Sequence, residues 1–154
     1  MTPRKNRIPV VFDTNVFIRF FLNPHRETAN NKVVKLWFAY RELQLIVSVP
    51  VVEEYTEILA RLGVEQRRIE HFTAKMQLDT VTWVNLGKRH RISRDADDNV
   101  MIDTARSGNA KYIISHDKDL LDIPAEDLRG VRCQIVKPPQ LLIDIVKPKR
   151  ANKP

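Results

Sequence analysis

Strand-like and helix-like patterns alternate along the chain, and this alternation limits the fold more than any other feature of the sequence. Short apolar runs rich in β-branched residues predict strands, and apolar residues at helical spacing predict helices between them. The predicted strands cover residues 8–12, 45–48, 81–84, 112–115 and 133–136. The predicted helices cover residues 15–22, 30–43, 51–62, 65–77, 97–106 and 139–146. Such an order favours a parallel sheet with helices on both faces.

The length and composition fit one globular domain. With 154 residues, 43% of them hydrophobic, the chain can bury a sizeable core. We expect a single domain over residues 1–154, with short basic tails at about 1–7 and 147–154. The longest apolar stretch is interrupted by Asp13 and Arg19 and is shorter than the roughly 20 residues of a membrane span. No signal-peptide pattern follows the basic start, so we expect a cytoplasmic protein with no membrane contact.

The net charge favours a polyanionic partner. The chain has 26 Lys and Arg against 19 Asp and Glu, which gives a formal charge of +7. A basic cluster lies directly upstream of the acidic residues at 95–98, and it comprises Lys88, Arg89, Arg91 and Arg94. A solvated basic surface is the alternative explanation for this charge. We predict that the four residues of the cluster contact the backbone of a nucleic acid.

Four acidic residues occupy positions where isolated carboxylates are uncommon. Asp13 and Asp117 follow the first and fourth predicted strands, whose carboxyl ends meet at one edge of a parallel sheet. Glu54 and Asp98 lie on the apolar stripes of two predicted helices, whereas their neighbours Glu53 and Asp97 do not. For Glu54 and Asp98, a buried salt bridge to arginine is the alternative explanation. Together, the four positions indicate a shared site.

Carboxylates gathered in one pocket need a cation. Two of them about 4 Å apart repel by roughly 4 kcal/mol at an effective dielectric constant near 20. The single cysteine, Cys133, excludes a Cys-rich zinc site. A set of oxygen ligands favours Mg2+ or Mn2+, which lower the pKa of bound water and stabilise phosphoryl transfer.

Four segments of the chain follow one another in an order and spacing that together are specific. They are Asp13-Thr14-Asn15 after a strand, Ser48 six residues before Glu54, Asp97-Asp98 at a helix start, and residues 113–121 with the letters IISHDKDLL. These segments resemble the PIN (PilT N-terminal) domain family, and within it the toxins of toxin–antitoxin pairs. The resemblance covers residues 10 to about 142. It implies a three-layer α/β/α sandwich with a central, mostly parallel sheet, and Mg2+- or Mn2+-dependent cleavage of RNA.

The resemblance also implies roles for individual residues and partners for the chain. The acidic catalytic set becomes Asp13, Glu54, Asp98 and Asp117, of which Asp13, Asp98 and Asp117 bind metal. Asn15 and Ser115 become polar supports. Asp119 is either an additional ligand or a stabiliser of the helix that follows it. RNA, an antitoxin protein and a second copy of the chain are the implied partners.

Two positions depart from the family pattern. His116 stands where the family often has glycine, and it either narrows the pocket, contacts substrate or is merely structural. Arg19 stands where a small polar residue is common, and it either reaches a phosphate or forms a salt bridge. We predict an endoribonuclease that acts as the toxin of a toxin–antitoxin pair. The alternatives are a non-catalytic RNA-binding module and a structure-specific DNA nuclease on the same fold.

Overall fold

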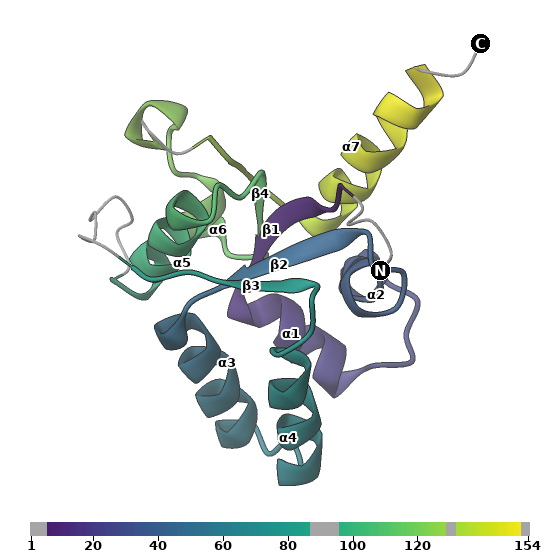
Figure 1. Cartoon of the computed structure of the whole chain (residues 1–154), viewed down its shortest axis with the longest axis vertical. Coiled ribbons are helices and arrows are strands. Elements are labelled where there is room, and N and C mark those ends of the chain that lie inside the picture. Colours follow the sequence, from purple (N-terminus) through teal and green to yellow (C-terminus); the bar gives the residue numbers. More distant parts are fainter. Residues whose placement is uncertain (1–5, 87–95, 129–131, 152–154) are drawn as a thin grey trace.

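The fold is built on parallel strands in the order β3-β2-β1-β4-β5 (Figure 1). The computed structural model describes residues 6–86, 96–128 and 132–151, and it gives only the backbone of residues 96–99 and 147–151. The strands are β1 (Ile8–Phe12), β2 (Leu43–Val47), β3 (Val81–Trp83), β4 (Tyr112–Ile114) and β5 (Gln134–Val136). Every adjacent pair of them is parallel, so the predicted parallel sheet is confirmed.

Helices connect the strands and cover both faces of the sheet. They are α1 (Thr14–Leu22), α2 (Ala29–Phe38), α3 (Val49–Arg61), α4 (Gln66–Lys75), α5 (Ala96–Ser107), α6 (Lys118–Leu121), the short 3-10 helix η1 (Ala125–Leu128) and α7 (Pro138–Ala151). Figure 1 shows α5 and α6 on one side of the sheet and α1, α2 and α7 on the other. The α3–α4 pair extends away from the sheet. This arrangement is the three-layer α/β/α sandwich expected from the sequence.

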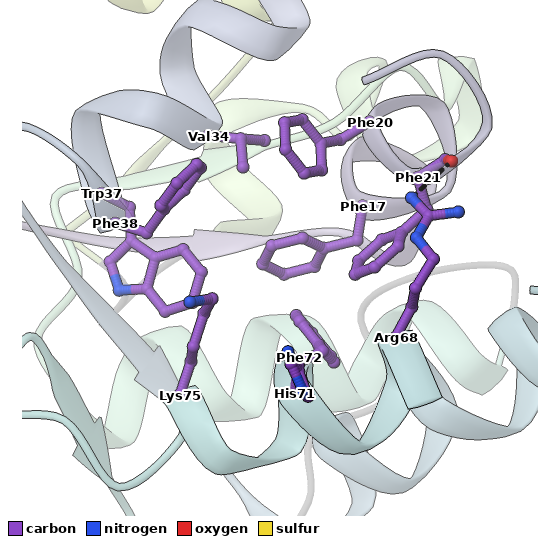
Figure 2. Close-up of a pocket in the computed structure, with 10 residues that line it drawn as sticks. All are labelled: Phe17, Phe20, Phe21, Val34, Trp37, Phe38, Arg68, His71, Phe72 and Lys75. Carbon is purple, nitrogen blue, oxygen red and sulfur yellow. Dashed lines mark hydrogen bonds between the residues drawn. The ribbon is translucent and has the colours of Figure 1, made fainter. Parts of the chain in front are cut away.

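The centre of the sheet forms the core because β1 is covered on both faces. Val10, Val11 and Phe12 of β1 are fully buried, as expected for a central parallel strand. An aromatic cluster fills the space between α1, α2, α3 and α4, and Figure 2 shows the part of it that lines a cavity. Its central ring, Phe17, meets Phe72 and Tyr55 edge-to-face with centroid distances of 4.8 and 4.9 Å. Such contacts orient the helices against one another.

The second predicted helix is shorter than expected. The sequence pattern predicts a helix over residues 30–43, but α2 ends at Phe38 and Leu43 begins β2. Arg41 adopts a left-handed backbone conformation with φ of 55°, and the N–H groups of Ala39 and Tyr40 both bond to Lys35 O. This geometry ends a helix, but glycine or asparagine usually provides it. The sequence therefore gave no signal that the helix stops here.

Other boundaries differ less. The first, third, fourth and fifth predicted helices each match an observed helix to within two residues at both ends, and α7 continues beyond residue 146. The short helices α6 and η1 lay outside the predicted set of elements. Within the part of the chain that the structure describes, no helix is both long and apolar enough to cross a membrane.

Candidate active site

The carboxyl ends of β1 and β4 are neighbours at the centre of the sheet, where the strand order reverses. From β1 the chain moves outward to β2 and β3, and then crosses to the other side of β1 for β4 and β5. A backbone hydrogen bond of 2.9 Å from Asp13 N to Ile114 O continues the pairing of β1 with β4 past the end of β1. In open parallel sheets this reversal creates a crevice in which ligands bind. Asp13 and Asp117 follow the two strands that flank it.

Asp13 ends β1 and caps α1. Its side chain is 7% exposed and accepts three hydrogen bonds. One oxygen accepts from Thr14 N at 2.8 Å. The other accepts from Asn15 Nδ2 at 3.2 Å and from Ser115 Oγ at 2.6 Å. The strand buries the carboxylate, and the helix start and the end of β4 provide its donors.

The electrostatic environment of Asp13 disfavours its negative charge. Burial raises the pKa of Asp13 above its ordinary value of 3.8, and the nearby negative charge of Asp117 raises it further. The hydrogen bonds from Ser115, Thr14 and Asn15 lower the pKa but compensate only in part. A buried carboxylate beside a second one is a favourable place for a cation.

Ser115 connects the two acids. Its hydroxyl donates to Asp13 and accepts from Asp117 N at 2.9 Å. Asp117 is half-buried and caps α6 by accepting from Asp119 N at 3.0 Å. Asp119 itself is exposed in the first turn of that helix. The structure therefore brings the predicted residues Asp13, Ser115 and Asp117 together.

Asn15 connects Asp13 to His116, the residue between Ser115 and Asp117. Its Nδ2 donates to Asp13, and its Oδ1 accepts from His116 N at 3.3 Å. The imidazole Nε2 of His116 lies 2.7 Å from Asn30 Oδ1. Burial, together with the positive charges of Arg19 and Lys137, lowers the pKa of His116 from 6.5 to about 4. The ring is therefore neutral at physiological pH.

Glu54 reaches the same region from α3. Thr14 Oγ1 donates a hydrogen bond to Glu54 Oε2, so the residue after Asp13 holds this carboxylate. Glu54 is half-buried, whereas the adjacent Glu53 is exposed. Glu57, which the helical spacing pairs with Arg61, does form that salt bridge, at 2.8 Å. The spacing argument thus separated the inward-facing glutamate from its neighbours on α3.

Sequence reasoning missed three residues that position the site. The buried Tyr55 hydroxyl donates to Phe12 O, which ties α3 to the residue before Asp13. Burial, and then the charges of Asp13 and Glu54, raise the pKa of Tyr55 well above 10, so it remains a donor. Thr14 orients Glu54, and Thr104 Oγ1 lies 2.8 Å from Ser48 Oγ, which joins α5 to the start of α3. Thr14 and Tyr55 belonged to segments that the sequence had singled out, but neither was given a role in the site, and Thr104 carried no such signal.

Several predicted residues lie outside the described part of the structure. The backbone of Asp98 is in the first turns of α5, but its side chain is not among those described. Lys88, Arg89, Arg91 and Arg94 fall in the undescribed segment 87–95. Their predicted roles stay predictions.

The described part of the pocket is compatible with a divalent cation. Among the described residues, no three His, Cys, Asp or Glu side chains are grouped closely enough to hold a metal ion. Asp117 is close enough to Asp13 for its negative charge to raise the pKa of Asp13. The Glu54 carboxylate accepts a hydrogen bond from Thr14, the residue that follows Asp13. Hard cations such as Mg2+ and Mn2+ prefer oxygen ligands of this kind. The raised pKa of Asp13 indicates a negative charge that a cation would stabilise.

The fold and the acidic edge define an α/β protein with two aspartates joined through a serine at the carboxyl ends of its central strands. The sequence model of the PIN domain matches residues 9–119, and the chain belongs to this family. PIN domains are nucleases and generally use divalent metal ions. The family expected from the sequence is therefore confirmed.

Individual proteins are similar to this chain over most of its length. The uncharacterized protein MJ1680 from Methanocaldococcus jannaschii is 27% identical, over 93% of this chain and 95% of its own length. The structure resembles VapBC2 from Rickettsia felis, bound to a DNA fragment from its promoter, with a TM-score of 0.52 and 11% identity over 83% of this chain and 98% of that one. It also resembles PAE2754 from Pyrobaculum aerophilum, with a TM-score of 0.52 and 16% identity over 94% of this chain and 99% of the other. At these identities the structural likeness establishes the fold.

Proposed function

We propose that this chain is a divalent-metal-dependent endoribonuclease and the toxin of a toxin–antitoxin pair. The observation that carries the proposal is the pair Asp13 and Asp117, held together by Ser115 beside the point where the strand order reverses. Membership of a nuclease family supports hydrolysis of phosphodiester bonds, and the basic composition supports a nucleic acid substrate.

In this proposal Asp13, Asp98 and Asp117 hold Mg2+ or Mn2+, and Glu54 completes the pocket. Such an ion, when bound, would lower the pKa of water and stabilise negative charge on the phosphoryl oxygens. Hydrolysis forms a bond between water oxygen and phosphorus, breaks one bond from phosphorus to a sugar oxygen, and returns a proton to that oxygen. We assign to Glu54, whose carboxylate accepts a hydrogen bond from Thr14, the role of accepting the proton of the attacking water. Asn15 and Ser115 keep the Asp13 carboxylate in position.

Cleavage assays test the proposal and its two alternatives together. Labelled single-stranded RNA and DNA of one sequence are incubated with Mg2+, with Mn2+ or with EDTA. We expect RNA cleavage with either metal and none with EDTA, and we expect Asp117→Asn to abolish it. Asp127→Asn, an exposed carboxylate of η1 that lies outside this region, is the matched control and should cleave like wild type. Cleavage of DNA alone supports the DNA nuclease, and RNA binding without cleavage supports the binding module.

The partner of the proposed toxin is an antitoxin protein. VapBC2, whose fold this chain shares, is a toxin–antitoxin complex. The surface that we propose for the partner is the cavity of about 240 Å³ between α1, α2 and α4 (Figure 2). Phenylalanine side chains line it, and Arg68, His71 and Lys75 follow one another along its α4 side. An apolar helix with acidic residues on one edge fits this chemistry.

Binding and association measurements test the two protein partners. If a neighbouring gene encodes a small DNA-binding protein, that protein should bind wild type and inhibit cleavage, and Phe20→Asp should prevent both effects. Unchanged binding by Phe20→Asp would place the partner elsewhere. The predicted homodimer is tested by the molar mass of the purified chain in solution, and a monomeric mass over the whole concentration range would contradict it.

A further inference from the structure

Two hollows meet beside the acidic pocket, and His116 and Pro139 line both of them. The first, of about 340 Å³, also contains Arg19 and Arg26 among its lining residues. The second, of about 620 Å³, is also lined by Lys118 and Lys137, among others. We call the two hollows together the His116 groove.

The His116 groove has an excess of positive charge. Arg19, Arg26, Lys118 and Lys137 are exposed, and in the described part of the chain none of them forms a salt bridge. Asp122 is the one carboxylate among the residues lining the two hollows. Unneutralised cations on both sides of a groove attract a polyanion that passes through it.

Buried amides fix the ring at the centre of the groove. Asn30 Nδ2 donates to Val16 O at 2.9 Å and to Asn31 Oδ1 at 3.2 Å, so Asn30 Oδ1 faces His116. Nε2 of His116 must therefore be the donor in the 2.7 Å contact with Asn30. The imidazole is a flat ring held in one orientation, and it is half-exposed to the groove.

The same amides position the loop that carries Arg26. Asn31 Nδ2 donates to Asn23 O and to Arg26 O, each at 2.8 Å. Asn30 and Asn31 are 5% and 2% exposed, so neither amide competes with water for these bonds. One hydrogen-bond network therefore fixes both the orientation of the His116 ring and the backbone at Arg26. A histidine that is merely buried would not need the second part of this network.

The His116 groove lies next to the proposed site of cleavage. His116 lies between Ser115 and Asp117, and its N–H donates to Asn15, which also bonds Asp13. A polynucleotide that crosses the ring of His116 would therefore pass close to Asp13 and Asp117. The folded chain thus places an aromatic ring, flanked by cations, next to a set of carboxylates.

We propose that the His116 groove binds single-stranded RNA next to the scissile phosphate, with an unpaired base stacked on His116 and phosphates contacting Arg19 and Arg26 on one side and Lys118 and Lys137 on the other. The inference rests on the proposed function, because it names the path of that substrate. Stacking requires a base that is not paired, so the groove selects single strands over duplexes. Contacts to phosphate fix the register and carry no sequence information.

Binding measured without cleavage tests the groove. Fluorescent single-stranded RNA is titrated in EDTA at several salt concentrations, with wild type, Arg19→Gln, Lys137→Gln and the double variant. Each lost phosphate contact should reduce the slope of log K against log salt by about 0.7. Arg61→Gln, an exposed arginine on α3, is the matched control and should bind like wild type. Unchanged slopes in the double variant would overturn the phosphate contacts.

Two substitutions at His116 separate stacking from structure. His116→Ala should weaken binding of unpaired RNA by about 5- to 150-fold, and His116→Phe should bind nearly as tightly as wild type, because it keeps an aromatic face. Duplex RNA of the same sequence should bind wild type and His116→Ala equally. If His116→Phe is as weak as His116→Ala while both melt as wild type does, the ring does not act by stacking.

The outcomes also separate this inference from the proposed function. If wild type cleaves RNA and all groove variants bind RNA normally, the proposed RNA-binding role of the groove is wrong and the proposed nuclease activity is supported. If groove variants bind RNA more weakly than wild type but wild type does not cleave RNA with Mg2+ or Mn2+, the RNA-binding role of the groove is supported and the proposed nuclease activity is wrong. If both hold, groove variants should raise KM with little change in kcat.

Discussion

Asp13 combines a structural role with an electrostatic cost. As the N-cap of α1 it satisfies a backbone N–H group, which is a common role for aspartate. Its burial and its neighbour Asp117 make the same carboxylate unfavourable when charged. An amide would cap the helix equally well without the charge. The aspartate therefore has a destabilising effect that capping alone does not explain.

The first prediction concerns this destabilising charge. In EDTA at pH 7, Asp13→Asn should have a higher melting temperature than wild type. Because folding raises the pKa of Asp13 above 3.8, the folded state favours the protonated acid. Its ionisation therefore reduces stability as pH rises from 3.8 through the raised pKa.

The difference in melting temperature between Asp13→Asn and wild type should disappear below pH 3.8. It should reach its full size at a pH where Asp13 of the wild type is ionised. Asp122→Asn, at an exposed position, should show no such pH-dependent gain in stability. Thermal melts across this pH range measure the difference. A lower melting temperature for Asp13→Asn at every pH would mean that its hydrogen bonds outweigh the cost of the buried charge.

The second prediction compares adjacent glutamates on α3. Glu54→Gln should reduce kcat by about 100-fold or more, because it removes the proposed proton acceptor but can keep the bond from Thr14. Glu53→Gln alters an exposed side chain and should leave kcat near wild type. Steady-state cleavage of one RNA by the two variants provides the test. Equal losses would show that the helical register does not decide which glutamate acts.

At the scale of elements, the close approach of α5 to the sheet depends on a glycine. Gly108 follows α5, and a Cβ atom built there would lie 2.3 Å from Cγ2 of the buried Ile46 on β2. No side chain fits at that distance unless the Ile46 side chain, the strand or the helix moves. This contact sets the height of α5 over β2, and α5 also carries Asp98.

The third prediction follows from this contact. Gly108→Ala should reduce the free energy of unfolding by about 1–3 kcal/mol, the usual effect of overpacking a core. In an Ile46→Ala background the alanine at 108 should have little further effect, because the atom that it meets is gone. Urea denaturation of the two single variants and the double variant gives the coupling energy. Ser107→Ala, at an exposed neighbouring position, is the control, and additive effects would contradict the prediction.

At the scale of the whole molecule, the proposed metal site connects segments that are far apart in the chain. Asp13 follows β1, Asp117 follows β4, and Asp98 is in α5. An ion bound by all three would bind the folded chain and not the unfolded one. It would therefore stabilise the entire fold by mass action.

The fourth prediction measures this stabilisation. Mg2+ at about 100 times its dissociation constant should stabilise wild type by about 2.7 kcal/mol relative to EDTA. Asp98→Asn should remove most of this gain and leave the melt in EDTA as high as that of wild type or higher, because repulsion between carboxylates is relieved. Asp97→Asn is the matched control and should respond to Mg2+ as wild type does. Equal stabilisation of wild type and Asp98→Asn would show that Asp98 is not a ligand.

The class of fold and the positions of most elements can be inferred from the amino-acid sequence. Alternating strand and helix patterns are local, and parallel strands joined through helices leave few arrangements open. The parallel sheet and the placement of Asp13 and Asp117 at one edge followed from these patterns, and the family followed from the resemblance of four short segments to the PIN domain. Where a local signal was absent, as at Arg41, the predicted boundary was wrong.

The contacts between side chains of distant segments depend on how the elements pack in the folded chain. Thr14 and Glu54 are 40 residues apart, His116 and Asn30 are 86 apart, and Ser115 and Asp13 are 102 apart. No periodicity within a segment encodes such pairs, because they depend on the order of strands in the sheet. The strand order placed β4 beside β1, and the helices after those strands then brought Arg19 near His116. Local sequence patterns thus show where the acidic residues lie within each element, but the packing of distant segments brings their side chains together.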